Sequence, residues 1–564
     1  MEALDWVVIG VFFLALIGII VWVVKQKQND SADYFLGGRD ATWIAIGASI
    51  FASNIGSEHL IGLAGAGASS GMAMAHWEIQ GWMILILGWV FVPFYTRSMV
   101  YTMPEFLERR YNPQSRTILS VISLVSYVLT KVAVTVYAGG LVFQQVFGIK
   151  ELWGIDFFWI AAIGLVLLTA LYTIFGGMKS VLYTSVLQTP ILLLGSLIIL
   201  VLGFKELGGW DEMMRVCGAV TVNDYGDTMT NLIRSNDDAN FPWLGALIGS
   251  AIIGFWYWCT DQFIVQRVLS GKNETEARRG TIFGAYLKLL PVFLFLIPGM
   301  IAFALHQKYI GAGGEGFLPM LANGNANADA AFPTLVAKLL PAGVKGLVVC
   351  GILAALMSSL ASLFNSSAML FTIDFYKRFR PETPEKKLVG IGQIATVVIV
   401  ILGILWIPIM RSVGDVLYTY LQDVQSVLAP GIAAAFLLGI CWKRTSAQGG
   451  MWGLISGMVI GLTRLGAKVY YSNASEVADS TFKYLFYDMN WLFFCGWMFL
   501  FCIIVVIVVS LATEAPTTEK IQGLVFGTAT KEQKAATRAS WNYWDIIHTI
   551  IILAITGAFY WYFW

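Results

Sequence analysis

The chain of 564 residues is 57% hydrophobic, 14% aromatic and only 13% charged, with a mean hydropathy of +0.71. Soluble domains are roughly 45 to 50% apolar with about a quarter of their residues charged, so this composition excludes a soluble protein and indicates a polytopic membrane protein. The net charge of +1 gives no sign of a nucleic-acid surface.

Apolar runs of about 17 to 25 residues are long enough to cross a bilayer. The first run has no basic leader and is too long for a cleavable signal, so we interpret it as a retained span. About fourteen spans are predicted, near residues 6–24, 43–66, 76–97, 117–142, 155–174, 183–203, 243–264, 280–306, 346–372, 388–409, 416–441, 449–468, 490–511 and 544–563.

The loops between these spans differ in positive charge. Alternate loops, such as those holding Arg109, Lys377 and Lys443, contain about 22 Lys and Arg residues, and the opposite set contains about ten. Because cytoplasmic loops retain positive charge, both termini are expected on the outer side of a plasma membrane, and a bacterial inner membrane is the expected location.

The second span, Gly47 to Gly71, mixes apolar residues with Asn54, Glu58 and His59 and with several glycines. A carboxylate at membrane depth costs about 2.5 to 3.5 kcal/mol, so it normally faces a cavity or a partner. Glycines and small polar residues allow the helix to unwind and expose its carbonyls and amides. We therefore expect a discontinuous helix that lines a binding site.

The seventh span, SAIIGFWYWCTDQFIVQR, is interrupted in the same way by Asp261 and Gln262. Two interrupted helices five spans apart are typical of an inverted repeat of five plus five helices. Two simpler interpretations stay open here. Asp261 could lie at the cytoplasmic end beside Arg267, and the Trp/Tyr/Trp cluster could belong to an interfacial belt.

Four other polar side chains lie within predicted spans. Lys288 and Lys131 either serve a site or extend toward the membrane surface. Glu78 either serves a site or favours the dipole at a helix start. Gln422 precedes Ala429-Pro430-Gly431, which predicts a break or kink, and its amide offers both the donor and the acceptor that a hydroxyl-rich solute requires.

The ninth span carries small residues at 355, 359, 362 and 366, a stripe that usually means close helix packing. Ser358 and Ser359 lie within it. If they face the helix of Asn54, two hydroxyls and freed carbonyls would form a neutral oxygen shell, which suits a monovalent cation.

The ordered motifs of residues 5 to 470 resemble the solute:sodium symporter family, and within it the sodium/glucose and sodium/galactose cotransporters. The motifs are DYFLGGR, GASIFASNIGSEHLIGLAGAGASSG, TMPEFLERR, LYTIFGGMKSVLYT, WYWCTDQFIVQR, GAYLKLLPVFLFLIPGM, MSSLASLFNSSAMLFTIDFYKR and LAPGIAAAFLLGICWKR. The resemblance implies an all-α LeuT-type inverted repeat with flanking helices. Its parts would be an extra N-terminal span (1–42), the first repeat (43–203), an outer loop (204–242), the second repeat (243–441) and additional C-terminal spans (442–564).

The resemblance also implies roles for individual residues. A sodium site would comprise the carbonyls of Ala52, Ile55 and Ala355 and the hydroxyls of Ser358 and Ser359. A sugar would be held by Asn54, His59, Glu78, Lys288 and Gln422, with Trp258 and Lys131 nearby and Tyr257 as its inner cap. An outer gate would comprise Leu63, Trp77 and Tyr418.

Four positions depart from family members. His59 replaces the glutamine of the bacterial galactose carrier and agrees with the animal glucose carriers. Gly254 stands where those relatives have a polar sugar-facing side chain, and Gly81 replaces a serine. Ser185 occupies a position that is aspartate in many members and is linked there to a second sodium site, so one sodium ion per turnover is expected.

The expected function is sodium-coupled import of a monosaccharide of glucose or galactose type across a lipid bilayer by alternating access. Symport of another solute, such as myo-inositol, a carboxylate or an amino acid, is the nearest alternative. A sugar sensor or sodium leak channel would keep the same site. An enzyme that uses Glu58, His59 and Glu78 is disfavoured, because the sequence has no HExxH motif.

Overall fold

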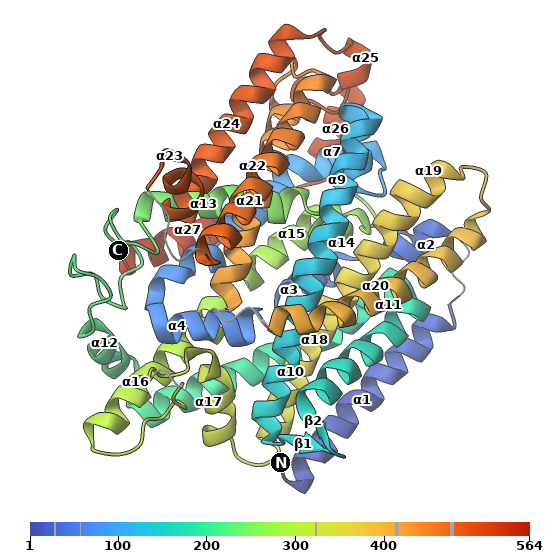
Figure 1. The fold of residues 1–564 in the computed structure, drawn as a ribbon. Coiled ribbons are helices and arrows are strands. Elements are labelled where there is room, and N and C mark those ends of the chain that lie inside the picture. Colours follow the sequence, from blue (N-terminus) through green and yellow to red (C-terminus); the bar gives the residue numbers. More distant parts are fainter. Residues whose placement is uncertain (27–29, 57, 322–323, 412–416, 474–478) are drawn as a thin grey trace.

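The computed structural model describes residues 1–26, 30–56, 58–321, 324–411, 417–473 and 479–564 (Figure 1). Side chains at 129–130, 145, 409–411, 417–421 and 472–473 lie outside this description. Within the described residues the chain is almost entirely helical, with one short antiparallel hairpin of two strands.

The first half begins at the N-terminal span and ends before a long connection at about residue 219. It contains α1 (Ala3–Val24), α2 (Ser31–Leu36), α3 (Trp43–Asn54), α4 (Ala64–Ser70), α5 (Ala75–Glu78), α6 (Gly81–Ile86), α7 (Val92–Ser98), α8 (Met103–Arg110), α9 (Pro113–Ser126), α10 (Ala133–Phe147), β1 (Glu151–Leu152), β2 (Ile155–Asp156), α11 (Phe157–Leu207) and α12 (Trp210–Gly218).

The second half contains α13 (Trp243–Gly254), α14 (Gln262–Leu269), α15 (Glu274–Lys288), α16 (Ile297–Gly311), α17 (Ala331–Leu339), α18 (Val344–Met369), α19 (Lys377–Phe379), α20 (Glu385–Arg411), α21 (Leu417–Cys441), α22 (Ala447–Asn473), α23 (Thr481–Lys483), α24 (Trp491–Ala512), α25 (Thr518–Ile521), α26 (Lys531–Ala539) and α27 (Tyr543–Tyr562). In the described part of the chain, seven π-helical segments adjoin these helices, at Glu58–Leu63, Leu87–Phe91, Tyr127–Val132, Phe255–Thr260, Val292–Leu296, Leu370–Tyr376 and Tyr484–Asp488.

Each of the fourteen predicted spans falls on helical structure where the chain is described. Ten described helical stretches are long and apolar enough to cross a membrane, and Trp43–Asn54 and Ala133–Gln144 are shorter apolar helices. The ten observed stretches are fewer than the fourteen predicted spans partly because α11 contains two of those spans. It bends at Gly177, whose φ of 54° favours glycine and whose missing side chain leaves room for the carbonyl oxygen of Tyr34.

Both predicted helix breaks are present. The helix α3 ends at Asn54, Ile55 has extended backbone angles, and helical structure resumes at Glu58. Asp261 is extended between Phe255–Thr260 and α14. At Ala429-Pro430-Gly431, where a break or kink was expected, there is no break, because α21 continues as one helix through Pro430. The kink stays a prediction.

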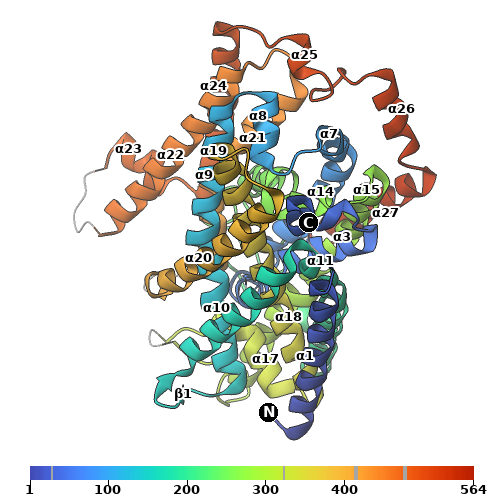
Figure 2. The same cartoon turned by 90° about the vertical axis from the view of Figure 1, so that its right-hand side faces the viewer.

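The broken helix α3 lies in the interior of the molecule. It packs against α11, α15 and α18, and α11 and α18 lie side by side along their length (Figures 1 and 2). The C-terminal helices α21, α22 and α24 pack against one another, and α21 and α24 also pack against α13. This arrangement surrounds the first break with helices from distant parts of the chain.

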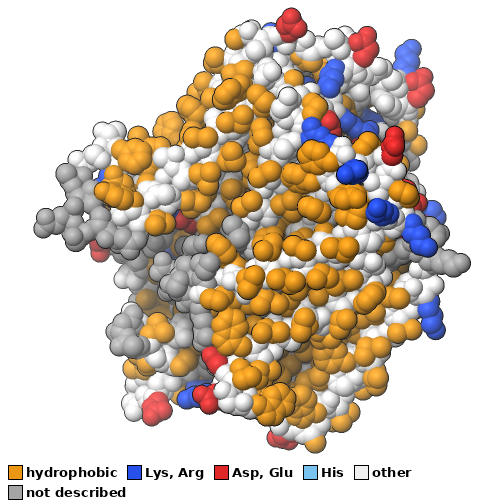
Figure 3. Space-filling model, turned by 45° about the vertical axis from the view of Figure 1, so that its right-hand side comes forward, with side chains coloured by type: hydrophobic (Ala, Val, Ile, Leu, Met, Phe, Trp, Pro, Cys, Tyr) orange, Lys and Arg blue, Asp and Glu red, His pale blue; other side chains and the backbone are white. Residues whose placement is uncertain are grey.

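The outer surface is apolar, as the composition predicts. Figure 3 shows a broad hydrophobic face with Lys and Arg side chains gathered along its upper right rim. Leu14 is 71% exposed, Ile394 65% and Trp497 62%. Large apolar side chains exposed over such an area are stable against lipid and not against water.

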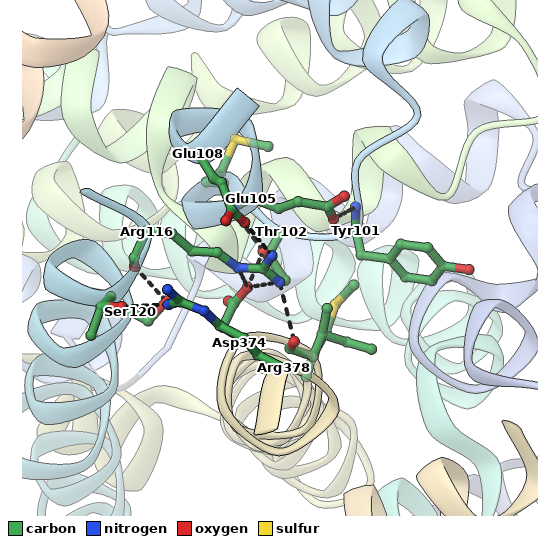
Figure 4. Close-up of polar contacts among 12 residues, drawn as sticks. Tyr101, Thr102, Glu105, Glu108, Arg116, Ser120, Asp374 and Arg378 are labelled. Atoms are coloured by element: carbon green, nitrogen blue, oxygen red, sulfur yellow. Dashed lines mark hydrogen bonds and ion pairs between the residues drawn. The ribbon is translucent and has the colours of Figure 1, made fainter. Parts of the chain in front are cut away.

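A polar network ties three helices together at the end of the molecule that carries α8 and α19 (Figure 4). Asp374 lies in Leu370–Tyr376, which continues α18. Its Oδ1 accepts hydrogen bonds from Arg116 Nε at 2.7 Å and from Thr102 Oγ1 at 2.8 Å, and Arg116 Nη1 donates to Glu108 Oε2 at 2.6 Å. The network fixes the start of α9 against α8 and against the end of α18.

Candidate functional site

A small cavity of about 50 Å³ lies between the two helix breaks. All eight side chains predicted to surround a solute line it, namely Asn54, His59, Glu78, Lys131, Tyr257, Trp258, Lys288 and Gln422. The sequence therefore identified residues that the fold brings together from both halves of the chain.

Lys288 is the centre of the polar contacts in this cavity. Its Nζ donates to Glu78 Oε2 at 2.6 Å and to Asn54 Oδ1 at 3.1 Å, and lies 5.3 Å from the centre of the Trp258 ring. Asn54 Nδ2 in turn donates to the Tyr257 hydroxyl at 3.2 Å. The interpretation of Lys288 as a lysine that extends to the membrane surface is wrong, because its side chain is buried.

A second basic side chain lies against the Glu78 carboxylate. His59 Nε2 lies 3.3 Å from the same Glu78 oxygen that binds Lys288. The His59 ring also meets Phe295 edge-on, with 6.3 Å between ring centres. The carboxylate thus links the second span to the eighth span at the cavity wall.

Lys131 lines the cavity, but its charge has another partner. Its Nζ lies 2.5 Å from Asp261 Oδ2, and Tyr127 donates to Asp261 Oδ1. Rings of Tyr127, Trp256, Tyr257 and Phe263 surround the ammonium, with centres at 4.8 to 5.2 Å. Asp261 therefore pairs with Lys131, whereas the Arg267 guanidinium donates to the carbonyl of Phe263.

Gln80 is a cavity residue that the sequence analysis did not single out. Its Nε2 donates to the carbonyl of Ser250 at 2.8 Å, and its Oε1 accepts from Trp258 Nε1 at 3.3 Å. A Cβ at Gly254 would lie 2.5 Å from Gln80 Oε1. The sequence did contain a signal for such a residue: Gly254 lacks the polar side chain of its relatives, so another side chain can fill the space beside it.

The residues predicted to bind sodium are buried where α3 meets α18. Ser53 and Ser362 join these helices through their hydroxyls, with 2.6 Å between oxygens. Ser359 lines the cavity, and Ser358 Oγ lies 3.3 Å from Ser185 Oγ. No described backbone amide donates to the carbonyls of Ala52 or Ile55, which leaves both oxygens available to a cation.

Two of the three residues predicted to form the outer gate, Leu63 and Trp77, have described side chains. Trp77 lines the cavity and stacks on Trp491, with 5.5 Å between ring centres and 24° between planes. Leu63 is fully buried. The side chain of Tyr418 lies outside the described residues. Glu58 also lines the cavity, and its carboxylate lies against Gly56.

Comparisons with known proteins show the family of this chain. The model of the "Sodium:solute symporter family" matches residues 34–457. The human sodium/myo-inositol cotransporter 2 is 36% identical over 542 residues, which are 94% of this chain and 79% of that protein. The human sodium/myo-inositol cotransporter is 36% identical over 550 residues, covering 93% of this chain and 76% of that protein.

The chain belongs to the sodium:solute symporter family. Among solved structures, a Na⁺-coupled sialic acid symporter aligns with a TM-score of 0.73, covering 92% of this chain and 99% of that chain, at 22% identity. The protein is thus a multi-pass membrane symporter of the predicted all-α, LeuT-type fold, and sodium is its coupling ion. Both human relatives are named as cotransporters of myo-inositol, a solute that the sequence analysis gave as the alternative to glucose or galactose.

Proposed function

We propose that this symporter imports a small, neutral polyhydroxylated solute together with sodium, and that a cyclitol of the myo-inositol type is its leading substrate. The observation that carries this proposal is the buried chain of contacts from Glu78 through Lys288 and Asn54 to Tyr257. It presents donors and acceptors side by side in one cavity. The names of the relatives support the cyclitol over a hexose.

The charges in the cavity favour a neutral solute over an anion. Lys288 is neutralised by Glu78, and Lys131 is neutralised by Asp261. A carboxylate solute would have to compete with these pairs, because removing a partner from a buried ion pair costs about 3 to 5 kcal/mol. A hydroxyl donates and accepts at once, so it can join such contacts without separating the charges.

The sodium ion would be held by the carbonyls of Ala52, Ile55 and Ala355 and by the hydroxyls of Ser358 and Ser359. These groups come from both sides of the contact between α3 and α18. An ion that bridges them orders the break beside Asn54 and raises solute affinity. By linkage, bound solute raises sodium affinity by the same factor. Occupation of both sites then permits the change from outward to inward opening.

Uptake into proteoliposomes tests this function. The purified protein is reconstituted and given an inward sodium gradient with labelled myo-inositol, glucose, galactose, an amino acid and a carboxylate in separate assays. Accumulation of myo-inositol above equilibrium, lost when choline replaces sodium, is the expected result. Accumulation of the amino acid or carboxylate alone would contradict the proposal, and sodium flux without accumulation would indicate a leak channel.

The sodium site is tested by Ser359→Ala. We expect sodium-stimulated uptake to be lost while the protein stays folded, because a hydroxyl ligand is removed from a shell that has no charged member. Ser367→Ala is the matched control, since Ser367 is a buried serine on the same helix outside the cavity lining. Undiminished sodium dependence in Ser359→Ala would remove this residue from the site.

The stoichiometry and orientation belong to the same proposal. Ser185 supplies a neutral hydroxyl beside Ser358, 3.3 Å away, so the carboxylate that would favour a second cation is missing there. One sodium ion per solute is therefore proposed.

Both termini are proposed to face outward, with the Lys- and Arg-rich loops on the cytoplasmic side.

A further inference from the structure

Gln80 forms part of the cavity wall two residues after Glu78 and is only 3% exposed. Its Nε2 donates one hydrogen bond to the carbonyl of Ser250, and its Oε1 accepts one from the indole N–H of Trp258. A glutamine amide offers two N–H donors and two lone pairs. One donor and one acceptor of Gln80 are therefore uncommitted among the described residues.

Gly254 is the residue that makes room for this amide. A Cβ at position 254 would lie 2.5 Å from Oε1 of Gln80, 2.9 Å from Cδ and 3.0 Å from Nε2. The backbone of Gly254 has ordinary helical angles, with φ at −62°, so conformational freedom does not require glycine. Glycine is required at this position because the Gln80 side chain occupies the space that a Cβ would need.

From this pair we propose that Gln80 is a solute-contacting residue that sets hydroxyl selectivity. Its uncommitted N–H and lone pair would bind one ring hydroxyl of a neutral polyol. This inference rests on the proposed function and adds a subsite to it. The amide takes the place that a polar side chain at position 254 would otherwise occupy.

The chemistry of an amide explains why such a subsite discriminates. A hydroxyl satisfies both the donor and the acceptor of Gln80, whereas a ring ether oxygen accepts only and a methylene does neither. A site built to bind a hydroxyl rejects analogues without it, because its own polar groups are then left unpaired. The subsite thus favours a ring that carries a hydroxyl at the contacted position.

A positioning role is the alternative that the experiment must separate. Gln80 accepts a hydrogen bond from the indole of Trp258, and the Lys288 ammonium lies 5.3 Å from the centre of the same ring. If Gln80 acted only through this ring, removing the indole N–H would have the same effect as removing the amide. Gln80→Met and Trp258→Phe therefore have to be compared with the same solutes.

The experiment measures sodium-driven uptake of myo-inositol and of a series of its monodeoxy analogues. In the wild type, one analogue should be transported with a KM raised about 5- to 30-fold relative to myo-inositol. In Gln80→Met, the KM for myo-inositol should rise by a similar factor and the difference between myo-inositol and that analogue should disappear. Trp258→Phe should keep the difference.

Two further variants test the pairing with Gly254. Gly254→Ala should displace the amide and reproduce the selectivity of Gln80→Met. The double variant Gly254→Ala with Gln80→Ala should be no worse than Gln80→Ala, because the amide with which the new methyl group collides is gone. Gln393→Met is the control, since Gln393 also donates to a backbone carbonyl, at 3.1 Å, but outside the cavity lining.

Each contrary result has a distinct meaning. If Gln80→Met still discriminates against the analogue, or if Trp258→Phe loses the discrimination equally, Gln80 is not a solute contact and the proposed function stands. If the wild type transports none of the polyols, the proposed function fails and this inference fails with it. Uptake by Gln393→Met that equals wild-type uptake shows that the assay reports the subsite and not the loss of any glutamine.

Discussion

The Glu78 carboxylate lies against two basic side chains of the site. It accepts from Lys288 at 2.6 Å and lies 3.3 Å from His59 Nε2, and its residue is 1% exposed. A charge at this depth persists only with partners of opposite charge. Glu78 therefore has two functions: it keeps Lys288 charged inside the protein and it offers acceptor oxygens to the cavity.

These two functions can be separated. In Glu78→Gln the Lys288 charge loses its partner, and we expect the free energy of unfolding to fall by about 3 to 5 kcal/mol. Adding Lys288→Met removes the stranded charge, so thermal unfolding in detergent should return most of the way to the wild-type temperature. Uptake should remain lost in the double variant, because both hydrogen-bonding groups are gone.

The comparison is read from unfolding curves and uptake assays on the same preparations. Recovered uptake in the double variant would show that the pair stabilises the fold without touching the solute. An unchanged unfolding temperature in Glu78→Gln would contradict the burial argument instead. Glu519→Gln provides a control on an exposed carboxylate of α25, where no effect on either measurement is expected.

Helix breaks are the elements that the sequence predicted best. Asn54, Gly56 and Ser57, and later Asp261 and Gln262, are polar or small residues in apolar runs, and local sequence is enough to mark where a helix unwinds. Pro430 does not break its helix, although a break was one of the two outcomes expected there. Its missing N–H alone does not interrupt α21, since a helix packed among neighbours tolerates proline.

Side-chain partners could not be predicted in the same way. Lys131 and Asp261 are separated by 130 residues, and Gln80 and Gly254 by 174, so each pairing depends on how distant helices pack. Lys131 was expected near the solute, and the fold brings it into the cavity with its charge held by Asp261. Gln80 lacks an individual signal because a glutamine near a helix start has many ordinary roles.

A short helix outside the spans, Ala328–Ala330, is expected to make the stability of its contact with α4 depend on pH. Asp329 lies in Ala328–Ala330, and its Oδ1 has no hydrogen-bond partner among the described residues. The carboxylate packs against Gly65 of α4. Burial raises the pKa of Asp329 from 3.8 to about 6. Charging this group at neutral pH therefore weakens the contact between the loop and α4.

The sign of the effect follows from the raised pKa. Because the folded state holds the proton more tightly than the unfolded state, the contribution of Asp329 to stability is fully present below pH 4 and is lost as pH rises through about 6. Hydrogen exchange in α4, corrected for the intrinsic rate, should be slower at pH 5.5 than at pH 7.5. Asp329→Asn should remove this difference, and an unchanged difference would assign it to another group.

At the scale of the whole molecule, composition and loop charge predicted the class of protein and a direction through the membrane. The fold class is confirmed by the matching family and by the similar fold of a solved symporter. The division into repeats at 43–203 and 243–441 stays a prediction. The solute could not be predicted, since hexoses and cyclitols present similar hydroxyls and differ at single positions that individual side chains such as Gln80 recognise.

The orientation of the whole molecule gives the last prediction. The hairpin β1–β2 and the short helix α19 lie at different ends of the molecule (Figure 2). Trp153, in the turn of the hairpin, is 84% exposed, and Phe379, at the end of α19, is 78% exposed. Lys377, Arg378 and Arg380 surround Phe379, whereas Lys150 alone lies near Trp153. Positive charge is retained on the cytoplasmic side, so Phe379 should face inward and Trp153 outward.

Single cysteines at these two positions measure the orientation directly. In a background that lacks the exposed Cys441, a membrane-impermeant maleimide applied to intact cells should label Trp153→Cys. Phe379→Cys should be labelled only after permeabilisation. Both positions are exposed, so access to the side chain is not limiting in either case. The reverse pattern would show that the excess of Lys and Arg does not set the orientation and would move the solute's entry to the other face of the protein.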